Sequence, residues 1–252
     1  MRRNQRIHQI LSAIVAHGSL EVPELAEQFG VSHATIRRDL EVLEQQRLVS
    51  RTRGGATTHA AFNDMPLSYK TTQDLVEKRK IAHEARRHLA GARVIGMTGG
   101  TTVTEFAHLL LEGEGLTVVT NALNVALHLL DNSRLRVFAA GGEVRSSSQE
   151  TVGHSAEEFL AEYNLDVAFV GVDGVDASAG CTNYDPAGAR ANAAMLQRAR
   201  KTIVLADATK IGRVALAQVC AMTAVDLLIT DDRAAEAQIE QIREHDCEVT
   251  LV

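Results

Sequence analysis

Apolar side chains near the start of the chain recur every three or four residues, a spacing that predicts helices. One helix is expected over residues 3–17 and ends at Gly18. A second, shorter helix is expected between Pro23 and Gly30, because proline suits the first turn of a helix and glycine ends one. The first 30 residues are therefore predicted to form two helices.

A third helix is expected directly after Ser32, which is a good N-cap. Ile36, Leu40 and Leu43 form its apolar stripe. Beyond this helix, the segment R-T-R-G-G-A at residues 51–56 has the glycines of a hairpin tip. Three helices followed by a hairpin, with a short turn between the second and third helices, are typical of a winged helix-turn-helix domain.

Farther along the chain, short apolar runs alternate with amphipathic stretches. The runs expected to form strands are 93–97, 116–119, 135–139, 167–172, 202–206, 227–230 and 248–252. The stretches expected to form helices between them are 102–111, 122–130, 156–163, 188–199 and 234–244. This alternation is typical of an α/β fold in which helices flank a mostly parallel sheet.

Residues 57–73 show no sustained periodicity and include Pro66, which is typical of a linker. A helix is expected to follow over residues 74–89. We therefore expect a winged helix-turn-helix domain at residues 1–58, a linker at 59–73 and an α/β domain at 74–252.

Charge is unevenly distributed between these parts. Residues 1–60 hold eight arginines and six acidic residues, a net charge of +2, whereas the rest holds 18 basic and 26 acidic residues, a net charge of −8. A mildly basic first domain on an acidic second one is consistent with a first domain that binds an anion.

The composition argues against a membrane or secreted protein. No apolar run reaches the roughly 18 residues that a membrane span needs, and the start M-R-R-N-Q-R-I-H lacks an apolar signal segment. The three cysteines, Cys181, Cys220 and Cys247, have no zinc-site spacing and are odd in number. We expect a cytoplasmic protein with reduced thiols and with no bound metal or cofactor.

The face of the third helix opposite its apolar stripe carries polar and basic side chains. In a helix-turn-helix the start of this helix enters the major groove, and the forked donors of arginine suit a guanine edge or a phosphate pair. The residues expected at the DNA are Ser32, His33, Ala34, Thr35, Arg37, Arg38, Arg51, Arg53, Gly54 and Gly55. The alternative is a solvated helix face on which Arg37 pairs with Glu41.

Two segments here are similar to a known family. V-S-H-A-T-I-R-R-D-L-E-V-L-E at residues 31–44, followed by L-V-S-R-T-R-G-G-A at 48–56, resembles the DNA-binding domain of the DeoR family of bacterial transcriptional regulators. The resemblance implies binding to double-stranded operator DNA, with Ser32, Thr35, Arg37 and Arg38 at the groove and the two glycines in the wing. Val22 departs from the pattern, because the family often has Ser or Thr there to cap the second helix, so a weaker cap is expected.

Polar and glycine-rich clusters follow five of the expected strands. The first, M-T-G-G-T-T at residues 97–102, leads into a helix and has the glycines, hydroxyls and helix N–H groups of a phosphate cradle, although a plain strand-to-helix turn is the alternative. Ligands of open α/β sheets bind outside the carboxyl ends of the strands, so the five clusters are expected to converge. The residues expected at this site are Thr98, Gly99, Gly100, Thr101, Thr102, Thr120, Asn121, Gly141, Gly142, Arg145, Asp173, Gly174 and Lys210.

Among these residues, Arg145 and Lys210 would balance a phosphate, and Asp173 would hold sugar hydroxyls. For each charged residue taken singly, a surface ion pair is the alternative.

The same clusters resemble the sensor domain of the DeoR family. The matching segments are G-G-T-T at 99–102, V-V-T-N at 118–121, A-A-G-G-E-V-R at 139–145, G-V-D-G-V-D at 171–176 and L-A-D-A-T-K-I-G-R at 205–213. The resemblance implies a fold similar to ribose-5-phosphate isomerase and a phosphorylated sugar as effector. It also implies a homodimer or homotetramer that represses a carbohydrate-catabolism operon. Many members have an acidic residue at the position of Thr98 and Glu at that of Gly188, so the effector or its affinity is expected to differ.

The rival function is a sugar-phosphate isomerase or deaminase. Residues 173–176, D-G-V-D, are similar to a segment of the isomerases, but the Lys-Gly-Gly loop and glutamate that follow it there are missing before Gly188. Isomerisation needs a carboxylate base and usually a cation, and no such pair is evident from the sequence. We therefore expect a regulator and not an enzyme.

Overall fold

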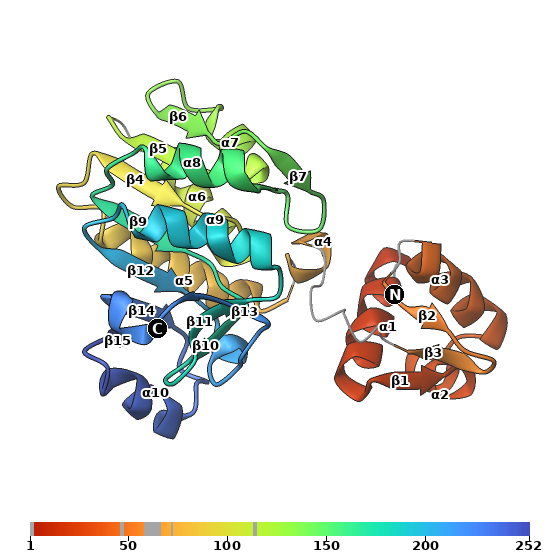
Figure 1. Ribbon diagram of the computed structural model, residues 1–252. Coiled ribbons are helices and arrows are strands. Elements are labelled where there is room, and N and C mark those ends of the chain that lie inside the picture. The colour runs from red at the N-terminus through yellow and green to blue at the C-terminus, as the bar shows by residue number, and fades with distance from the viewer. Residues whose placement is uncertain (1–2, 46–47, 58–66, 72, 113–114) are drawn as a thin grey trace. The chain divides into compact units, whose positions relative to one another are not determined.

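The computed structural model describes the chain except for residues 1–2, 46–47, 58–66, 72 and 113–114. Most of the expected linker therefore lies outside the described residues. The chain divides into two compact units, residues 1–65 and 66–252, and each is treated by itself. Figure 1 labels the elements of both units.

The N-terminal unit contains the three predicted helices: α1 (Arg3–His17), α2 (Val22–Phe29) and α3 (His33–Gln45). They pack around fully buried apolar side chains, including Ile10, Leu25 and Leu40. Three short strands, β1 (Ser19–Glu21), β2 (Ser50–Arg51) and β3 (Gly55–Thr57), form an antiparallel sheet in the order β1-β3-β2. The winged helix-turn-helix prediction is thus confirmed, although β1 was not expected because its three residues carry no clear pattern.

The cap of α2 differs from the expectation. Val22 is the first helical residue, and Glu21 is the N-cap. The side chain of Glu24 accepts a hydrogen bond from the Glu21 N–H at 2.8 Å, and the reciprocal bond from the backbone at Glu24 to the Glu21 side chain completes a capping box. The prediction of a weaker cap was wrong, because the side chains of Glu21 and Glu24 each accept a hydrogen bond from the backbone N–H of the other residue.

The C-terminal unit is built on seven parallel strands in the order β15-β14-β12-β9-β4-β5-β6. These are β4 (Val94–Met97), β5 (Thr117–Thr120), β6 (Arg136–Ala139), β9 (Val167–Val170), β12 (Thr202–Leu205), β14 (Leu227–Thr230) and β15 (Glu248–Leu251). All seven lie where the apolar runs predicted them. The chain proceeds outward from β4 in one direction and from β9 in the other, which makes the ends of these strands a topological switch point.

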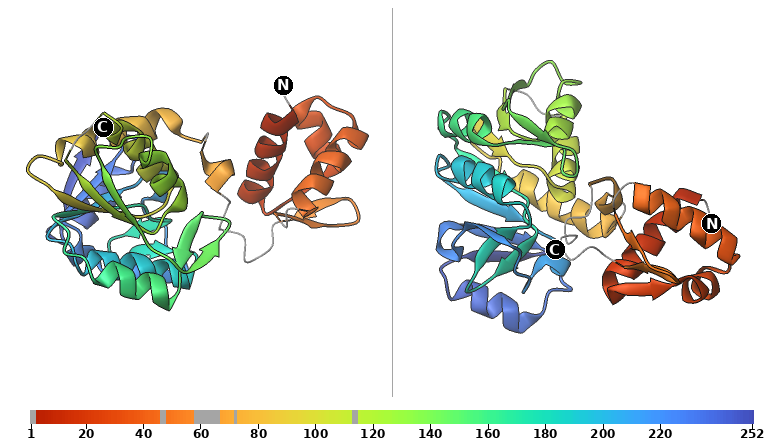
Figure 2. Two further views of the ribbon diagram at one scale, coloured as in Figure 1. Left: turned by 90° about the horizontal axis from the view of Figure 1, so that it is seen from above. Right: turned by 45° about the vertical axis from the view of Figure 1, so that its right-hand side comes forward.

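Helices cover both faces of this sheet (Figures 1 and 2). One apolar cluster joins the sheet to α5 (Leu75–Arg87), α6 (Thr101–Leu110) and α7 (Leu123–Leu129). The other joins it to α8 (His154–Ala161), α9 (Pro186–Leu196) and α10 (Glu236–Arg243). Neighbouring residues of one strand pack on opposite faces of the sheet, as Phe169 and Val170 do. The α/β prediction is confirmed.

Several short elements of the C-terminal unit were not predicted. They are the helical turns α4 (Leu67–Lys70), η1 (Ala208–Lys210) and η2 (Met222–Ala224), the hairpin of β7 (Glu143–Arg145) and β8 (Glu150–Val152), and an antiparallel sheet of β10 (Gly174–Asp176), β11 (Gly180–Asn183) and β13 (Ala217–Cys220). Elements of three or four mixed residues carry no usable periodicity. In the described part of the chain, no helix is long and apolar enough to cross a membrane.

Candidate functional site

The start of α3 is fixed by a local hydrogen-bond pair. The backbone N–H of Thr35 donates to Oγ of Ser32 at 3.2 Å, and the two side-chain hydroxyls lie 3.0 Å apart. Ser32 is therefore the cap that its sequence position predicted. The side chains of His33 and Ala34 next to this cap are exposed.

The inner side of α3 is held by a buried carboxylate. Asp39 is 1% exposed, and it accepts a hydrogen bond from Nε of Arg6 at 2.7 Å and lies 3.5 Å from Nε of Arg3. These pairs tie α3 to α1. On the outer side, Arg37 and Arg38 are exposed, and neither side chain forms an ion pair with any residue that the structure describes. The Arg37–Glu41 pair considered as an alternative is not formed.

The wing contacts α3 through its first arginine. Nη1 of Arg51 donates to the backbone oxygen of Arg37 at 3.4 Å, whereas Arg53 is exposed. Gly54 and Gly55 have a packing role, because a Cβ at Gly55 would lie 2.1 Å from the Leu20 oxygen and one at Gly54 would meet the Glu21 side chain. Gly55 is buried. Contact of these two glycines with DNA stays a prediction.

The second predicted site lies at the carboxyl ends of β4, β5, β9 and β12. Thr98, directly after β4, is buried, and its Oγ1 accepts a hydrogen bond from the Gly171 N–H at 2.9 Å. Gly100 is the N-cap of α6, and Thr101 and Thr102 are its first residues. Thr98 therefore links two neighbouring strand ends.

A carboxyl group that the sequence analysis missed faces this loop. Oε1 of Glu150, at the start of β8, accepts hydrogen bonds from the Gly99 N–H at 3.0 Å and from Nδ2 of Asn121 at 3.5 Å. Glu150 is buried, and this burial raises the pKa of its carboxyl group. No Cβ fits at Gly99, because it would lie 2.6 Å from the Glu150 carboxyl carbon. The Gly99 N–H of the expected cradle is therefore already occupied.

The polar residues after β5 form hydrogen bonds beside the same loop. Oγ1 of Thr120 accepts a hydrogen bond from the Ala122 N–H at 3.0 Å, and Nδ2 of Asn121 also donates to the Thr151 oxygen at 3.3 Å. Oδ1 of Asn121 is buried and accepts no hydrogen bond from the residues that the structure describes. A buried acceptor of this kind calls for a donor.

A second cluster surrounds Asp173, which follows β9. Its Oδ1 lies 3.0 Å from Nζ of Lys70 on α4, and its Oδ2 accepts the Tyr184 N–H at 3.2 Å. Burial alone would raise the pKa of Asp173, but the ammonium groups of Lys70 and Lys210 outweigh it and lower this pKa. Asp173 is therefore an ionised carboxylate that is paired with Lys70.

Lys210 is the last residue of η1, and the charges of Asp173 and Asp207 both act on its ammonium group. The loop after η1 is joined to β10 by a hydrogen bond from the Gly212 N–H to the Val175 oxygen at 2.8 Å. Gly174 packs against the same loop, since a Cβ there would lie 2.3 Å from the Arg213 oxygen. Burial and the nearby charge of Lys70 lower the pKa of Lys210 to about 8.

Arg145 lies on the β7–β8 hairpin and pairs with the cap of α9. Its Nε is 3.5 Å from Oδ2 of Asp185, whose Oδ1 accepts the Gly188 N–H at 2.6 Å. A Cβ at Gly188 would come within 3.3 Å of this Oδ1. Gly141 and Gly142 precede the hairpin and are exposed. Gly188 is thus part of a close helix cap.

The structure brings together most of the predicted residues and adds others. Asp173, Gly174 and Lys210 share one cluster, and Gly99 and Asn121 share another. Lys70, Glu150 and Asp185 were missed, because their positions depend on short elements that fold onto the strand ends. No group of three or more metal-ligating side chains occurs among the described residues.

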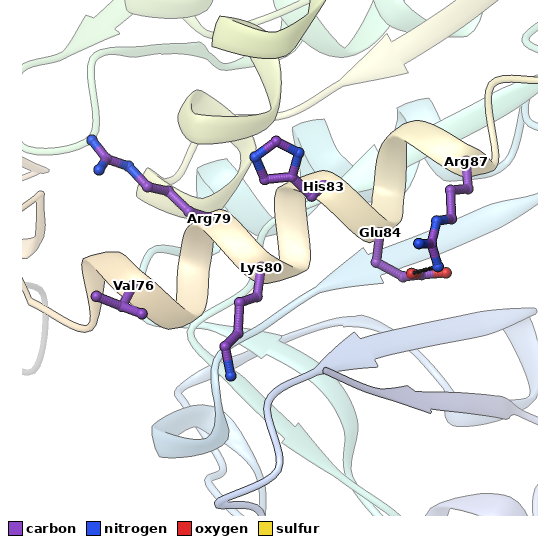
Figure 3. Close-up of a pocket in the computed structure, with 6 residues that line it drawn as sticks. All are labelled: Val76, Arg79, Lys80, His83, Glu84 and Arg87. Atoms are coloured by element: carbon purple, nitrogen blue, oxygen red, sulfur yellow. Dashed lines mark hydrogen bonds and ion pairs between the residues drawn. The ribbon is translucent and has the colours of Figure 1, made fainter.

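A shallow hollow elsewhere on this unit is a different feature (Figure 3). Its lining comes from one helix, α5, and consists of Val76, Arg79, Lys80, His83, Glu84 and Arg87. Glu84 pairs with Arg87 at 2.7 Å and Arg79 with Glu105 at 3.0 Å. This surface bears none of the predicted site residues.

Comparisons with known proteins show which family the two units belong to. A family model described as a DeoR-like helix-turn-helix domain matches residues 6–61, and one described as the DeoR C terminal sensor domain matches residues 73–232. The glycerol-3-phosphate regulon repressor of Escherichia coli K12 is 30% identical over 251 residues, covering 100% of both chains. A putative aga operon transcriptional repressor of Escherichia coli O157:H7 is 31% identical over 254 residues, covering 99% of this chain and 94% of its own.

Among solved structures, a ribose 5 phosphate isomerase A from Neisseria gonorrhoeae matches 56% of this chain and 54% of its own, with 21% identity and a TM-score of 0.39. A similarity of that size carries no conclusion about activity. The two family matches and the relatives that match over their full length show the family instead. This chain belongs to the DeoR family of transcriptional regulators.

Proposed function

We propose that this protein represses a carbohydrate-catabolism operon and leaves its operator when a phosphorylated sugar or sugar derivative binds the C-terminal unit. The observation that carries the proposal is the outer face of α3. Its arginines are exposed without ion pairs in the described structure, while the inner face is locked to α1 through Asp39. A rigid helix that presents unpaired arginines suits a polyanionic partner.

The details of α3 suit readout of a DNA major groove. Arg37 and Arg38 are close to the start of the helix, which is the part that enters the groove in this motif. The neighbouring N–H groups and the exposed Arg53 in the wing suit contacts with phosphates. Arg51 has a further role, because it links the wing to the backbone of Arg37.

The site at the strand ends suits a phosphorylated polyol. Lys70 and Lys210 supply positive charge, and the carboxyl group of Glu150 and the buried Oδ1 of Asn121 accept hydrogen bonds from hydroxyl groups. The printed name of one relative, a glycerol-3-phosphate regulon repressor, supports an effector of this class.

Repression and release require that the effector bind the DNA-bound and free forms with different affinities. A homodimer or homotetramer would place two copies of α3 on operator half-sites. The proposal assigns no catalysis to the strand-end site, and interconversion of sugar phosphates by the purified protein would favour the isomerase or deaminase alternative.

Fluorescence anisotropy tests the proposal. The protein is titrated into labelled duplex DNA from its own promoter region at two salt concentrations, with random duplex as the control. Tight, salt-dependent binding to the promoter DNA that one sugar phosphate reverses is the expected result. Equal affinity for both duplexes would contradict operator recognition, and specific binding that no sugar phosphate reverses would contradict the effector class.

A further inference from the structure

All three cysteines of the chain pack on the same apolar cluster of the C-terminal unit. Cys181 and Cys247 are buried in it, and Cys220 is partly buried against it. Cys181 lies on β11, Cys220 is the last residue of β13, and Cys247 directly precedes β15. None of them is among the residues assigned to the two sites above. The cluster is therefore a group of nucleophilic side chains without an assigned role.

Cys181 and Cys220 are direct cross-strand neighbours. The strands β11 and β13 are adjacent and antiparallel (Figure 1), and their register places Cys181 opposite Cys220. Opposite residues of an antiparallel pair have Cα atoms roughly 4.5–5.5 Å apart and side chains on the same face of the sheet. A disulfide needs Cα atoms about 4.4–6.8 Å apart. The two sulfur atoms can therefore be joined with little movement of the backbone.

The two thiols of this pair differ in reactivity. Hydrogen bonding to Cys220, together with burial, raises the pKa of the Cys181 thiol, whereas hydrogen bonding to Cys181 lowers the pKa of the Cys220 thiol. Cys181 is also fully buried, whereas Cys220 is partly exposed. Because the thiolate is the nucleophile, an oxidant from solution reacts first with Cys220.

Cys247 is a less suitable partner for Cys220. Its Sγ donates a hydrogen bond to the Glu248 oxygen at 3.4 Å, and burial raises its pKa to about 11. Cys247 is 27 positions from Cys220 in the sequence, whereas Cys181 is 39 positions away. Loop closure in an unfolded chain would therefore favour the pair of Cys220 and Cys247. A preference for Cys181 would come from the fold.

We propose that Cys181 and Cys220 form a peroxide-sensitive dithiol that closes to an intramolecular disulfide between β11 and β13. The Cys220 thiolate attacks one oxygen of hydrogen peroxide, the O–O bond breaks, and Cys220 becomes a sulfenic acid while the departing hydroxide is protonated to water. The Cys181 sulfur then attacks the Cys220 sulfur, so that the S–S bond forms and the S–O bond breaks. The proton of Cys181 leaves with this hydroxide as a second water. The thiols are thus oxidised and the peroxide is reduced.

The disulfide would form next to residues that support the strand-end site. On β11, Oδ1 of Asn183 accepts a hydrogen bond from the Asp173 N–H at 3.2 Å, and Oγ1 of Thr182 accepts one from the Ala215 N–H at 2.8 Å. A cross-link at Cys181 would fix β11 directly before these two residues. The pairing of the cysteines does not rest on the proposed function, because it needs no effector and no DNA.

Peptide mapping of the full-length protein after treatment with hydrogen peroxide tests the proposal. Trypsin cleaves after lysine and arginine, so the cysteines fall on three separate peptides, 146–190, 214–233 and 244–252. We expect the folded wild type to lose two of its three thiols and to yield peptide 146–190 joined to 214–233, a link that a dithiol reductant reverses. The same treatment in urea is the reference, and the selectivity for this pair should be lost there.

Three variants test the order of the two steps. Cys247→Ala should form the same cross-link as the wild type. Cys181→Ala should leave Cys220 as a sulfenic acid that dimedone captures, because the second thiol is missing. Cys220→Ala should show no such capture at Cys181, which is buried.

The mapping of the wild type decides the proposal without any variant. Retention of all three thiols, a main product that joins 214–233 to 244–252, or a disulfide between two molecules would overturn it. Capture of a sulfenic acid at Cys181 in Cys220→Ala, as strong as that at Cys220 in Cys181→Ala, would overturn the assignment of Cys220 as the thiol that reacts first.

Discussion

At the scale of single residues, the two sites differ in how their charges are compensated. Arg37 and Arg38 project without ion pairs in the described structure, whereas Asp173 and Arg145 are both paired within the C-terminal unit. Unpaired charge suits a large anionic partner that approaches from outside. A paired charge suits a small ligand, because the ligand can take the place of the side chain with which that charge is paired.

Arg37→Ala is expected to weaken operator binding by about 1–3 kcal/mol, which is the usual cost of losing a base or phosphate contact of this type. Effector binding should be unchanged. Anisotropy with promoter DNA measures the first effect and calorimetry the second. Arg200→Ala removes the same charge from an exposed position of the C-terminal unit and is the matched control. Loss of effector binding in Arg37→Ala would contradict the separation of the two sites.

Glu150→Gln is expected to stabilise the protein increasingly as the pH rises above the ordinary pKa of a glutamate carboxyl group. Burial raises the pKa of the folded-state carboxyl group, so its contribution to stability is fully present below its unfolded-state pKa and is lost as the pH rises through the folded-state value. Glutamine keeps an oxygen for the Gly99 N–H and does not ionise.

Thermal unfolding at several pH values measures this difference, because about 1 kcal/mol shifts the midpoint by roughly 2–4 °C in a chain of this size. Glu162→Gln, at an exposed position after α8, provides the comparison. A difference between Glu150→Gln and wild type that stays constant with pH would show that the carboxyl group is not desolvated.

At the scale of elements, the buried Asp39 determines how firmly α3 is presented. Asp39→Ala would leave the partly buried guanidinium of Arg6 without its partner and is expected to destabilise the N-terminal unit by about 3 kcal/mol. Urea denaturation measures this loss, and Glu41→Ala on the exposed side of α3 should change stability by less than about 0.5 kcal/mol. Equal effects of the two substitutions would contradict an anchoring role of Asp39.

The elements that the sequence predicted correctly are those with clear periodicity. Ile36, Leu40 and Leu43 identify α3, and continuous apolar runs such as 227–230 identify the buried parallel strands. The α4 turn and the β7–β8 hairpin have no such pattern, so Lys70 and Glu150 were not recognised. Their burial arises only when these short elements fold onto the strand ends.

At the same scale, one motif was predicted correctly in place but not in detail. The G-G-T-T segment lies at the switch point of the sheet as expected, yet the Gly99 N–H faces a carboxyl group that is 51 positions away in sequence. A local motif predicts which backbone groups are available. It does not predict which distant side chain occupies them.

At the scale of the whole molecule, the chain combines a DNA-binding unit with a separate unit that carries the polar strand-end site. Regulation then requires a free-energy coupling between the two ligands. Thermodynamic linkage makes that coupling reciprocal, so the factor by which effector weakens operator binding must equal the factor by which operator weakens effector binding.

The most direct test is the operator affinity of the wild type measured by anisotropy with and without a saturating sugar phosphate, beside Lys210→Ala as the variant impaired in effector binding. The account predicts that the sugar phosphate weakens operator binding of the wild type by about fivefold or more, and that Lys210→Ala binds the operator normally but is not released. An operator affinity of the wild type that is unchanged by a saturating effector would contradict the account.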